Sequence, residues 1–205
     1  MAYLQYWLGA QPDGTGKLDA YSSYSAQLLG SLHWWMWLEG AHVVAITVFA
    51  GTILFVDLRL LGLALPNVPV SRVSRSLLPL TVGAFAFVVI TGVATFYSKP
   101  FDYYHHFAFR AKLLFLLLAA ANIFIFHGRV QANQAAWDDA ARPPVAARRS
   151  AALSLLLWTL VIGGGRCMAY ERYGCSATTA PLVSALADCE GKSATLALIG
   201  KEVSL

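Results

Sequence analysis

Four long apolar runs alternate with short polar connections along the chain, which has 205 residues. The runs cover residues 32–65, 77–97, 109–127 and 151–170. One bilayer crossing takes roughly 20 apolar residues in a helix, so each run is long enough to cross once. The pattern predicts an all-α integral membrane protein, a four-helix bundle.

Two flanking segments complete the predicted organisation. We expect an N-terminal interfacial segment over residues 1–31, a transmembrane domain over 32–170 and an extramembrane tail over 171–205. Apolar residues recur at loose helical spacing in the first segment, which fits a short interfacial helix or an ordinary connecting helix. The chain opens without the pattern of a signal peptide, so its N-terminus is expected to be retained.

Composition supports the membrane assignment. Hydrophobic residues make up 58% of the chain and charged residues only 13%, against about a quarter charged in an average soluble domain. The net charge is +4, but Lys and Arg are spread along the chain instead of gathered on one segment. We therefore expect basic loops beside a lipid bilayer and no nucleic-acid partner.

The basic loop residues predict the orientation. On one side the connections hold Arg72, Arg75, Arg129, Arg142, Arg148 and Arg149. The connection on the other side holds only Lys99, so the positive-inside rule places both termini outside the cytoplasm. The three cysteines then lie in an oxidising compartment, where Cys175 and Cys189 could close a disulfide loop and Cys167 has no assigned role.

Ionisable residues of the first and third runs fall at two matching depths. His42 precedes Asp57 by 15 residues and Lys112 precedes His127 by 15, a rise of about 22 Å in each helix. Both runs cross in the same direction, so His42 and Lys112 are expected at one level. Further residues complete the two levels: Glu39, Arg110 and Arg166 at the outer one, Arg59 at the inner one.

The outer level has the residue types of a haem site. Ligand atoms lie about 2 Å from a metal, so His42 and His127 cannot share an iron, whereas His42 and a neutral Lys112 can. Burial disfavours the charged amine, which makes such ligation possible. Arg166 and Arg110 suit the propionates because a guanidinium pairs bidentately with a carboxylate.

Other interpretations of the same residues stay open. His42 could be satisfied by Glu39 or by a neighbouring helix, and Lys112 could extend to the membrane surface. His127 is interpreted as a partner of Asp57.

The outer turn offers a second set of histidines. His105 or His106 is the rival second ligand of the haem, and with Asp102 the two could bind copper or zinc. His33 lies about 180° around the helix from His42 and is expected at the membrane interface. Gly83 and Gly92 permit the close approach of a neighbouring helix or a flat ligand.

Several short motifs resemble a known group of proteins. They are Glu39 and His42, GTILFVDLRLLG at 51–62, FRAKLL at 109–114, His127, and Gly165–Arg166 followed by Ala169 and Tyr170. The set resembles small four-helix bacterial membrane proteins of uncharacterised function, which are similar to the membrane domain of copper resistance D proteins. It also distantly resembles the four-helix haem-binding protoporphyrinogen oxidases. In that last group a first-helix histidine and a third-helix lysine are associated with haem b, which implies His42 and Lys112 here.

The leading hypothesis is a multi-pass protein of the bacterial inner membrane that binds one haem b and exchanges electrons with a quinone or a partner subunit. A second hypothesis is a cofactor-free accessory subunit of a larger membrane complex. A third is copper handling at the outer face. No enzymatic activity is assigned.

Overall fold

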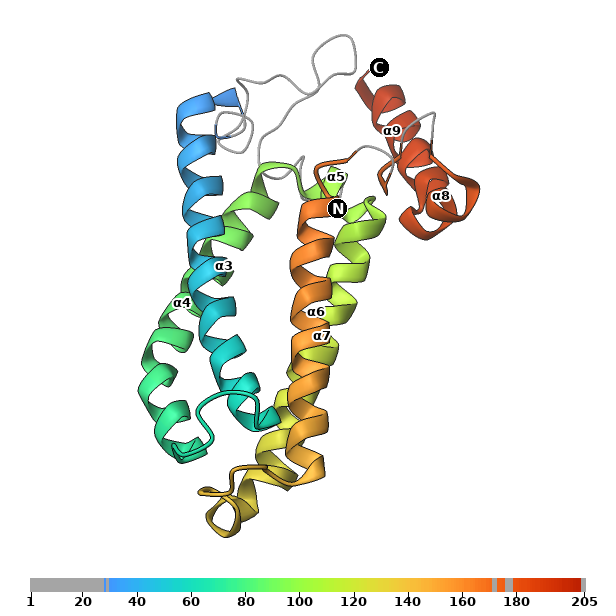
Figure 1. Ribbon diagram of the computed structural model, residues 1–205. Coiled ribbons are helices and arrows are strands. Elements are labelled where there is room, and N and C mark those ends of the chain that lie inside the picture. Colours follow the sequence, from blue (N-terminus) through green and yellow to red (C-terminus); the bar gives the residue numbers. More distant parts are fainter. Residues whose placement is uncertain (1–27, 29, 171–172, 176–178, 204–205) are drawn as a thin grey trace. The chain divides into compact units, whose positions relative to one another are not determined.

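The structure, a computed structural model, describes residues 28, 30–170, 173–175 and 179–203 (Figure 1). The interfacial helix expected before residue 32 falls almost entirely outside the described residues. The described part of the chain is helical and contains no strand. Four helices are long and apolar enough to cross a membrane. The predicted all-α fold with four spans is therefore confirmed.

The four long helices account for the four apolar runs. They are α3 (Leu32–Leu61), α4 (Val70–Ser98), α6 (Phe107–Ile125) and α7 (Val145–Cys167). A π-helical turn, Phe126–Val130, and a 3-10 segment, Gln131–Ala136, continue α6. The short helices are α5 (Pro100–Tyr104), α8 (Pro181–Ala187) and α9 (Cys189–Val203). The predicted tail over residues 171–205 thus contains the helices α8 and α9.

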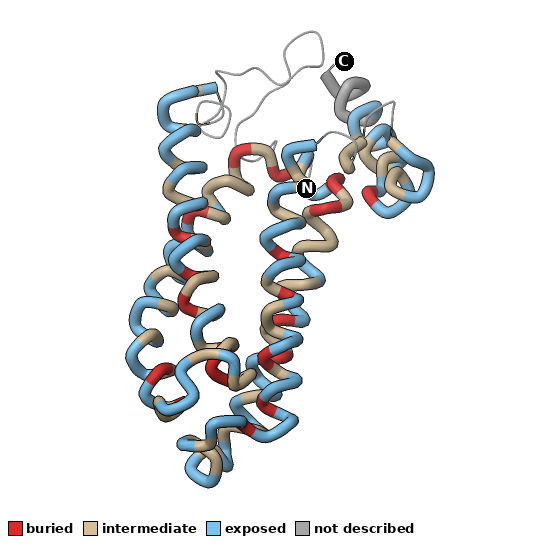
Figure 2. The backbone as a smooth tube through the Cα atoms, in the orientation of Figure 1, coloured by how far each residue is buried: buried red, intermediate tan, exposed pale blue. Residues whose placement is uncertain are grey.

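Burial along the long helices is the reverse of that in a soluble protein. Many large apolar side chains are exposed, for example Leu117 at 70% and Phe124 at 76%. Exposed positions, in pale blue, recur along all four long helices (Figure 2). Buried positions on the same helices include Thr52, Asp57 and Asn122. Apolar groups outside and polar groups inside are typical of helices that face lipid.

Several helix boundaries differ from the prediction, and the fourth span, for example, begins at Val145 and not at residue 151. The first span ends at Leu61 and not at residue 65, because Gly62 adopts a left-handed conformation with φ 75°. The carbonyl oxygen of Ala141 lies 3.0 Å from where a Cβ of Gly62 would stand, so a side chain there would crowd this backbone and be strained by the positive φ. The second span begins at Val70 and not at residue 77, which places Arg72 and Arg75 on the helix instead of in a connection.

Backbone contacts divide the chain into two compact units, and each long helix has a part in both. Unit 1 comprises residues 1–42, 90–111 and 164–205. Unit 2 comprises residues 43–89 and 112–163.

Small residues of α7 let it pack closely in unit 2. Ala147 and Ala151 are fully buried and form a core with Leu60 of α3 and Val70 of α4. Further along α3, the buried ring of Phe49 packs edge-on against Trp158 of α7, with ring centroids 4.7 Å apart.

Asp138, in the connection between α6 and α7, caps the first turn of α4. Its Oδ1 accepts a hydrogen bond of 2.7 Å from the Ser71 backbone N–H, and its Oδ2 accepts one from the Ser71 hydroxyl. A helix N-terminus leaves backbone N–H groups unpaired, and a carboxylate there also interacts favourably with the helix dipole. This cap explains why α4 begins seven residues earlier than expected, since Val70 stands seven positions before residue 77.

We expect Asp138→Asn to lower the stability of unit 2 by about 0.3–1 kcal/mol at neutral pH, because the amide loses the negative charge that interacts with the helix N-terminus. Burial alone would raise the pKa of Asp138, but hydrogen bonds from Ser71 and Gln134 and the charge of Arg59 hold it below the usual value. A lowered pKa gives stability that is present above the unfolded pKa and is lost as the pH falls through the folded one. The difference in thermal midpoint between the wild type and Asp138→Asn should therefore be constant near neutrality and shrink below about pH 4.

The exposed neighbour Asp139 is the matched control for this measurement. Asp139→Asn should leave the midpoint unchanged at every pH. An equal loss in both variants would show that the connection responds to charge in general and not to the cap.

Within unit 1, the tail is bound to α5 and to the start of α6 by hydrogen bonds and an ion pair. The predicted pairing of Cys175 with Cys189 is confirmed as a disulfide. Lys192 of α9 donates a hydrogen bond of 2.7 Å to Asp102 of α5, inside an ion pair. Arg110 of α6 donates to the Leu186 carbonyl oxygen at 3.0 Å. These contacts join α8 and α9 to the start of the third span.

We expect Cys189→Ser to loosen the tail while leaving the four long helices intact. Closing a loop of about 15 residues is worth about 3 kcal/mol, and the contacts of Lys192 and Arg110 alone have to replace it. Limited proteolysis of the detergent-solubilised protein should cut the tail of this variant several-fold faster. Cys167 is a free cysteine, so Cys167→Ser should resist the protease as the wild type does. Equal cleavage of all three proteins would contradict a stabilising role of the disulfide.

Candidate functional site

His42 lies half-buried on α3 and contacts α4 directly. Its Nδ1 is hydrogen-bonded to Oγ1 of the buried Thr91 at 2.7 Å. The next residue, Gly92, lies so close that a Cβ there would stand 3.3 Å from Cε1 of the imidazole. The expectation that Gly92 permits close approach is therefore confirmed, whereas Gly83 has nothing within 4 Å of such an added atom. Of the two partners weighed for His42, the neighbouring helix is the observed one.

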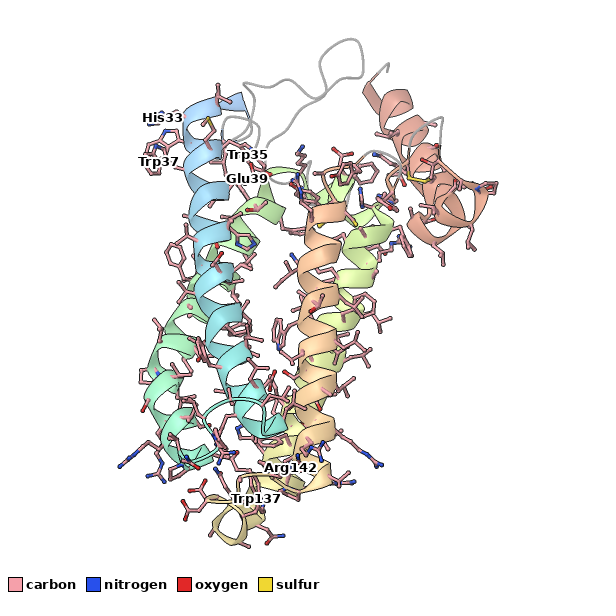
Figure 3. All side chains as sticks on the ribbon, viewed as in Figure 1. His33, Trp35, Trp37, Glu39, Trp137 and Arg142 are labelled. Carbon is pink, nitrogen blue, oxygen red and sulfur yellow. A yellow bond between two sulfur atoms is a disulfide. The ribbon has the colours of Figure 1, made fainter. Side chains whose placement is uncertain are left out.

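The outer turns of α3 present two different sides. His33 and Trp37 project from one side and Trp35 and Glu39 from the other (Figure 3). His33 and Glu39 are both exposed. The ammonium of Lys99 lies 5.9 Å from the Trp35 ring centroid and 6.0 Å from that of Tyr103. This side of α3 therefore carries a cation–aromatic cluster.

The environment of Tyr103, in α5, changes the pKa of its phenol. Burial raises the pKa of its phenol, and the negative charges of Glu39 and Asp102 act in the same direction. The phenol therefore stays protonated and neutral throughout the physiological pH range.

Lys112 lies in unit 2, where it is half-buried on α6. Its ammonium makes no hydrogen bond or ion pair with any residue that the structure describes. His42 belongs to unit 1, and the pairing of His42 with Lys112 stays a prediction.

The two arginines expected at the propionates differ in their contacts. Arg110 is engaged by the tail and its own turn: it donates to the carbonyl oxygens of Tyr104 and Leu186 at 2.9 and 3.0 Å and lies 3.8 Å from Asp188. Arg166 is exposed at the end of α7, with its guanidinium 5.9 Å from the Tyr170 ring centroid. Arg166 is therefore the better candidate for an external carboxylate.

His105 and His106 are both buried in the outer turn. His105 bonds through Nδ1 to the Phe101 carbonyl oxygen at 3.0 Å, and its Nε2 lies 3.9 Å from Asp188. The Tyr170 backbone lies near His106, but neither ring nitrogen of His106 has a hydrogen bond of good geometry within the described residues. Burial lowers the pKa of His106, and the charge of Lys192 acts in the same direction. Among the described residues no three His, Cys, Asp or Glu side chains gather into a metal-binding group.

The expected pairing of His127 with Asp57 is wrong. His127 is exposed in the π-helical turn and is hydrogen-bonded through Nδ1 to the Ile123 carbonyl oxygen at 2.9 Å, one turn back in its own helix. No ion pair joins it to Asp57 within the described residues. The sequence pattern contained no signal for the π-helical turn.

Polar links between helices were also missed. Asn122 of α6 and Ser150 of α7 are doubly hydrogen-bonded, each contact being 3.0 Å long. Arg59 is completely buried at the end of α3 and donates to the carbonyl oxygens of Val68 and Ala140. An isolated Asn or Arg near a span end gives no information about its partner.

Four apolar helices with outward apolar side chains and inward polar ones define a multi-pass integral membrane protein. Residues 20–171 match a family of unknown function (DUF6644), and the chain belongs to this family. The match ends before the disulfide-closed tail. No curated protein and no solved structure matches the chain. The expected membership of an uncharacterised family is confirmed, and no similarity to copper resistance D proteins or to protoporphyrinogen oxidases is found.

Proposed function

We propose that this protein is a b-type haem protein of the membrane in which His42 ligates the iron, and that it exchanges electrons with a quinone or a partner subunit. The observation that carries the proposal is the hydrogen bond between His42 Nδ1 and Thr91 Oγ1. Histidines that ligate metals almost always donate their other ring N–H to an acceptor. A Thr91 hydroxyl that accepts from Nδ1–H fixes the tautomer in which Nε2 carries the lone pair.

The residues around His42 hold its ring in one orientation. Gly92 lets the imidazole pack closely against α4, and Thr91 is hydrogen-bonded to Nδ1. When bound, a haem supplies the one-electron redox chemistry, and the protein tunes it through the ligands and their hydrogen bonds.

Lys112 is proposed as the second ligand. It stands at the same register as His42, 15 residues before an inner-level ionisable residue, and its ammonium has no partner in the described part of the chain. A primary amine ligates only after losing its proton, and burial favours that loss. Arg166 is proposed to pair with a propionate. Arg110 is not, because it already contacts Leu186 and Asp188 of the tail.

The same proposal places both termini outside the cytoplasm of a bacterial inner membrane. The Cys175–Cys189 disulfide supports this orientation because disulfides persist in oxidising compartments. The exposed arginines at this end of the helices, such as Arg129 of the π-helical turn and Arg148 in the first turn of α7, agree with a cytoplasmic location of that end.

The test is an optical spectrum of the purified full-length protein, reduced with dithionite. We expect a Soret band with about one haem per chain. Thr91→Val keeps the side-chain shape but removes the hydroxyl, and we expect about tenfold weaker haem binding, the usual lower range for lost orienting partners.

Thr81→Val is the matched control, because Thr81 lies on the same helix and, within the described residues, its hydroxyl donates only to the Leu77 carbonyl oxygen of that helix. It should bind haem as the wild type does. A preparation without Soret absorption, even after haem is supplied, would contradict the proposal.

A second candidate function is that of an accessory subunit in a membrane complex. It is favoured by the folded tail, on which Leu182, Leu186 and Leu196 are 72%, 46% and 49% exposed. Exposed apolar side chains on a fixed helical segment suit a partner subunit. Copper handling at His105 and His106 stays a prediction.

A further inference from the structure

Asp57 is a buried carboxyl group within the membrane-spanning part of α3. Its exposure is 5%, and its Oδ2 has no hydrogen-bond partner within the described residues. The Ser154 side chain of α7 lies within hydrogen-bonding reach of the carboxyl group. Asp57 stands one turn before Leu60, which packs against the fully buried Ala147 and Ala151. The carboxyl group is thus enclosed by a closely packed α3–α7 contact.

The charged groups of unit 2 leave Asp57 without a counter-ion. Arg59, two residues along α3, directs its guanidinium to the Val68 and Ala140 carbonyl oxygens. On α6 and its extension, Lys112 is half-buried and His127 and Arg129 are exposed. The remaining basic residues of unit 2 are all exposed: Arg72, Arg75, Arg142, Arg148 and Arg149. None of these forms an ion pair with Asp57.

An ionised carboxylate in such a place is costly. A buried charge without a partner loses its hydration and gains no compensating attraction, and the group becomes neutral instead. The protonated carboxyl group carries no charge and has one O–H donor, so its burial costs much less than the burial of the carboxylate. Carboxyl groups within membrane spans commonly serve proton or ion pathways.

We propose that Asp57 is a proton-binding site of the membrane interior, protonated in the closed α3–α7 contact and able to exchange its proton with the cytoplasmic side. Binding adds one proton to a carboxylate oxygen and removes one negative charge from the bundle, and release returns that proton to water. The proposal stands apart from haem binding, because it rests on the burial of Asp57 and on its contacts with α7, which the haem proposal does not use. Only the direction of proton exchange rests on the proposed orientation.

The direct test is infrared spectroscopy of the full-length protein in lipid at pH 7. The wild-type minus Asp57→Asn difference spectrum should contain the C=O stretch of one protonated carboxyl group, shifted in D2O. Asp138 is hydrogen-bonded as a carboxylate, so Asp138→Asn should remove carboxylate bands only. Loss of carboxylate bands alone in Asp57→Asn would overturn the proposal.

A second measurement needs no variant and applies if Asp57→Asn does not fold. Dicyclohexylcarbodiimide reacts with protonated carboxyl groups in apolar surroundings. One molecule adds to each carboxyl group, and the N-acylurea product retains all atoms of both reactants. Mass spectrometry should locate the adduct on Asp57, with a rate that falls as the pH rises, and not on Asp138. Labelling of Asp57 at a rate that does not depend on pH would overturn the proposal. Protection of Asp57 from labelling by sodium but not by potassium would also overturn it, because that result indicates a sodium site.

Discussion

We expect His42→Ala to lower the Soret absorption of the purified protein at least tenfold, and this is the largest effect on function that the haem proposal predicts. The substitution removes the proposed ligand atom and leaves the Thr91 hydroxyl without its partner on α3. A remaining ligand on one side holds a haem far more weakly, so occupancy should fall at least tenfold. Haem content per chain, measured after detergent extraction and size-exclusion chromatography, checks the prediction.

His33→Ala is the matched control for that variant. His33 lies on the same helix but is exposed, with its ring near Trp34 and Trp37, 6.3 and 6.4 Å between ring centroids. It should retain the wild-type spectrum. Unchanged absorption in His42→Ala, or an equal loss in both variants, would remove His42 from the proposal. Thermal unfolding of both variants separates loss of haem from loss of fold.

The four spans could be predicted from the sequence because lipid imposes a simple length requirement on apolar runs. Span ends could not be predicted, because they depend on residues distant in the chain. The start of α4 depends on Asp138, 67 residues away from Ser71. The end of α3 depends on the close approach of Ala141 to Gly62. Neither partner has a sequence signal of its own.

The candidate site was predictable only in part. The spacing of His42 identified a buried ionisable group, and its half-buried contact with α4 agrees with that expectation. The predicted orientation places the cysteines where disulfides form, and the structure pairs Cys175 with Cys189. Helical spacing assigns a depth but no direction to a side chain, so it gave Asp57 the wrong partner in His127. Helical spacing also did not predict that Arg110 donates a hydrogen bond to the Leu186 carbonyl oxygen of the tail.

Arg59→Ala produces the largest expected loss of stability. Arg59 is completely buried, and its Nε and Nη2 donate to the carbonyl oxygens of Val68 and Ala140 at 2.7 and 3.1 Å. The side chain thereby joins the end of α3 to both connections of unit 2. Hydrogen bonds to charged groups are worth about 1.5–3 kcal/mol each, and truncation leaves both carbonyl oxygens buried without a donor. Truncation also removes the buried Nη1, which has no partner in the described residues, and so removes the desolvation cost of that group. We therefore expect the free energy of unfolding to fall by about 3 kcal/mol in total.

For a chain of this size, 1 kcal/mol shifts the thermal midpoint by about 2–4 °C, so Arg59→Ala should unfold about 6–12 °C below the wild type. Arg75→Ala, which removes an exposed arginine from α4, should stay within about 1 °C, since exposed substitutions change stability little. Arg59→Lys keeps the charge but offers a different donor geometry and should fall between them. A midpoint of Arg59→Ala equal to that of Arg75→Ala would mean that the two carbonyl contacts contribute nothing to the stability of unit 2. The charge of Arg59 also helps to hold the pKa of Asp138 down, so Arg59→Ala should in addition move the acid-induced loss of the α4 cap to higher pH.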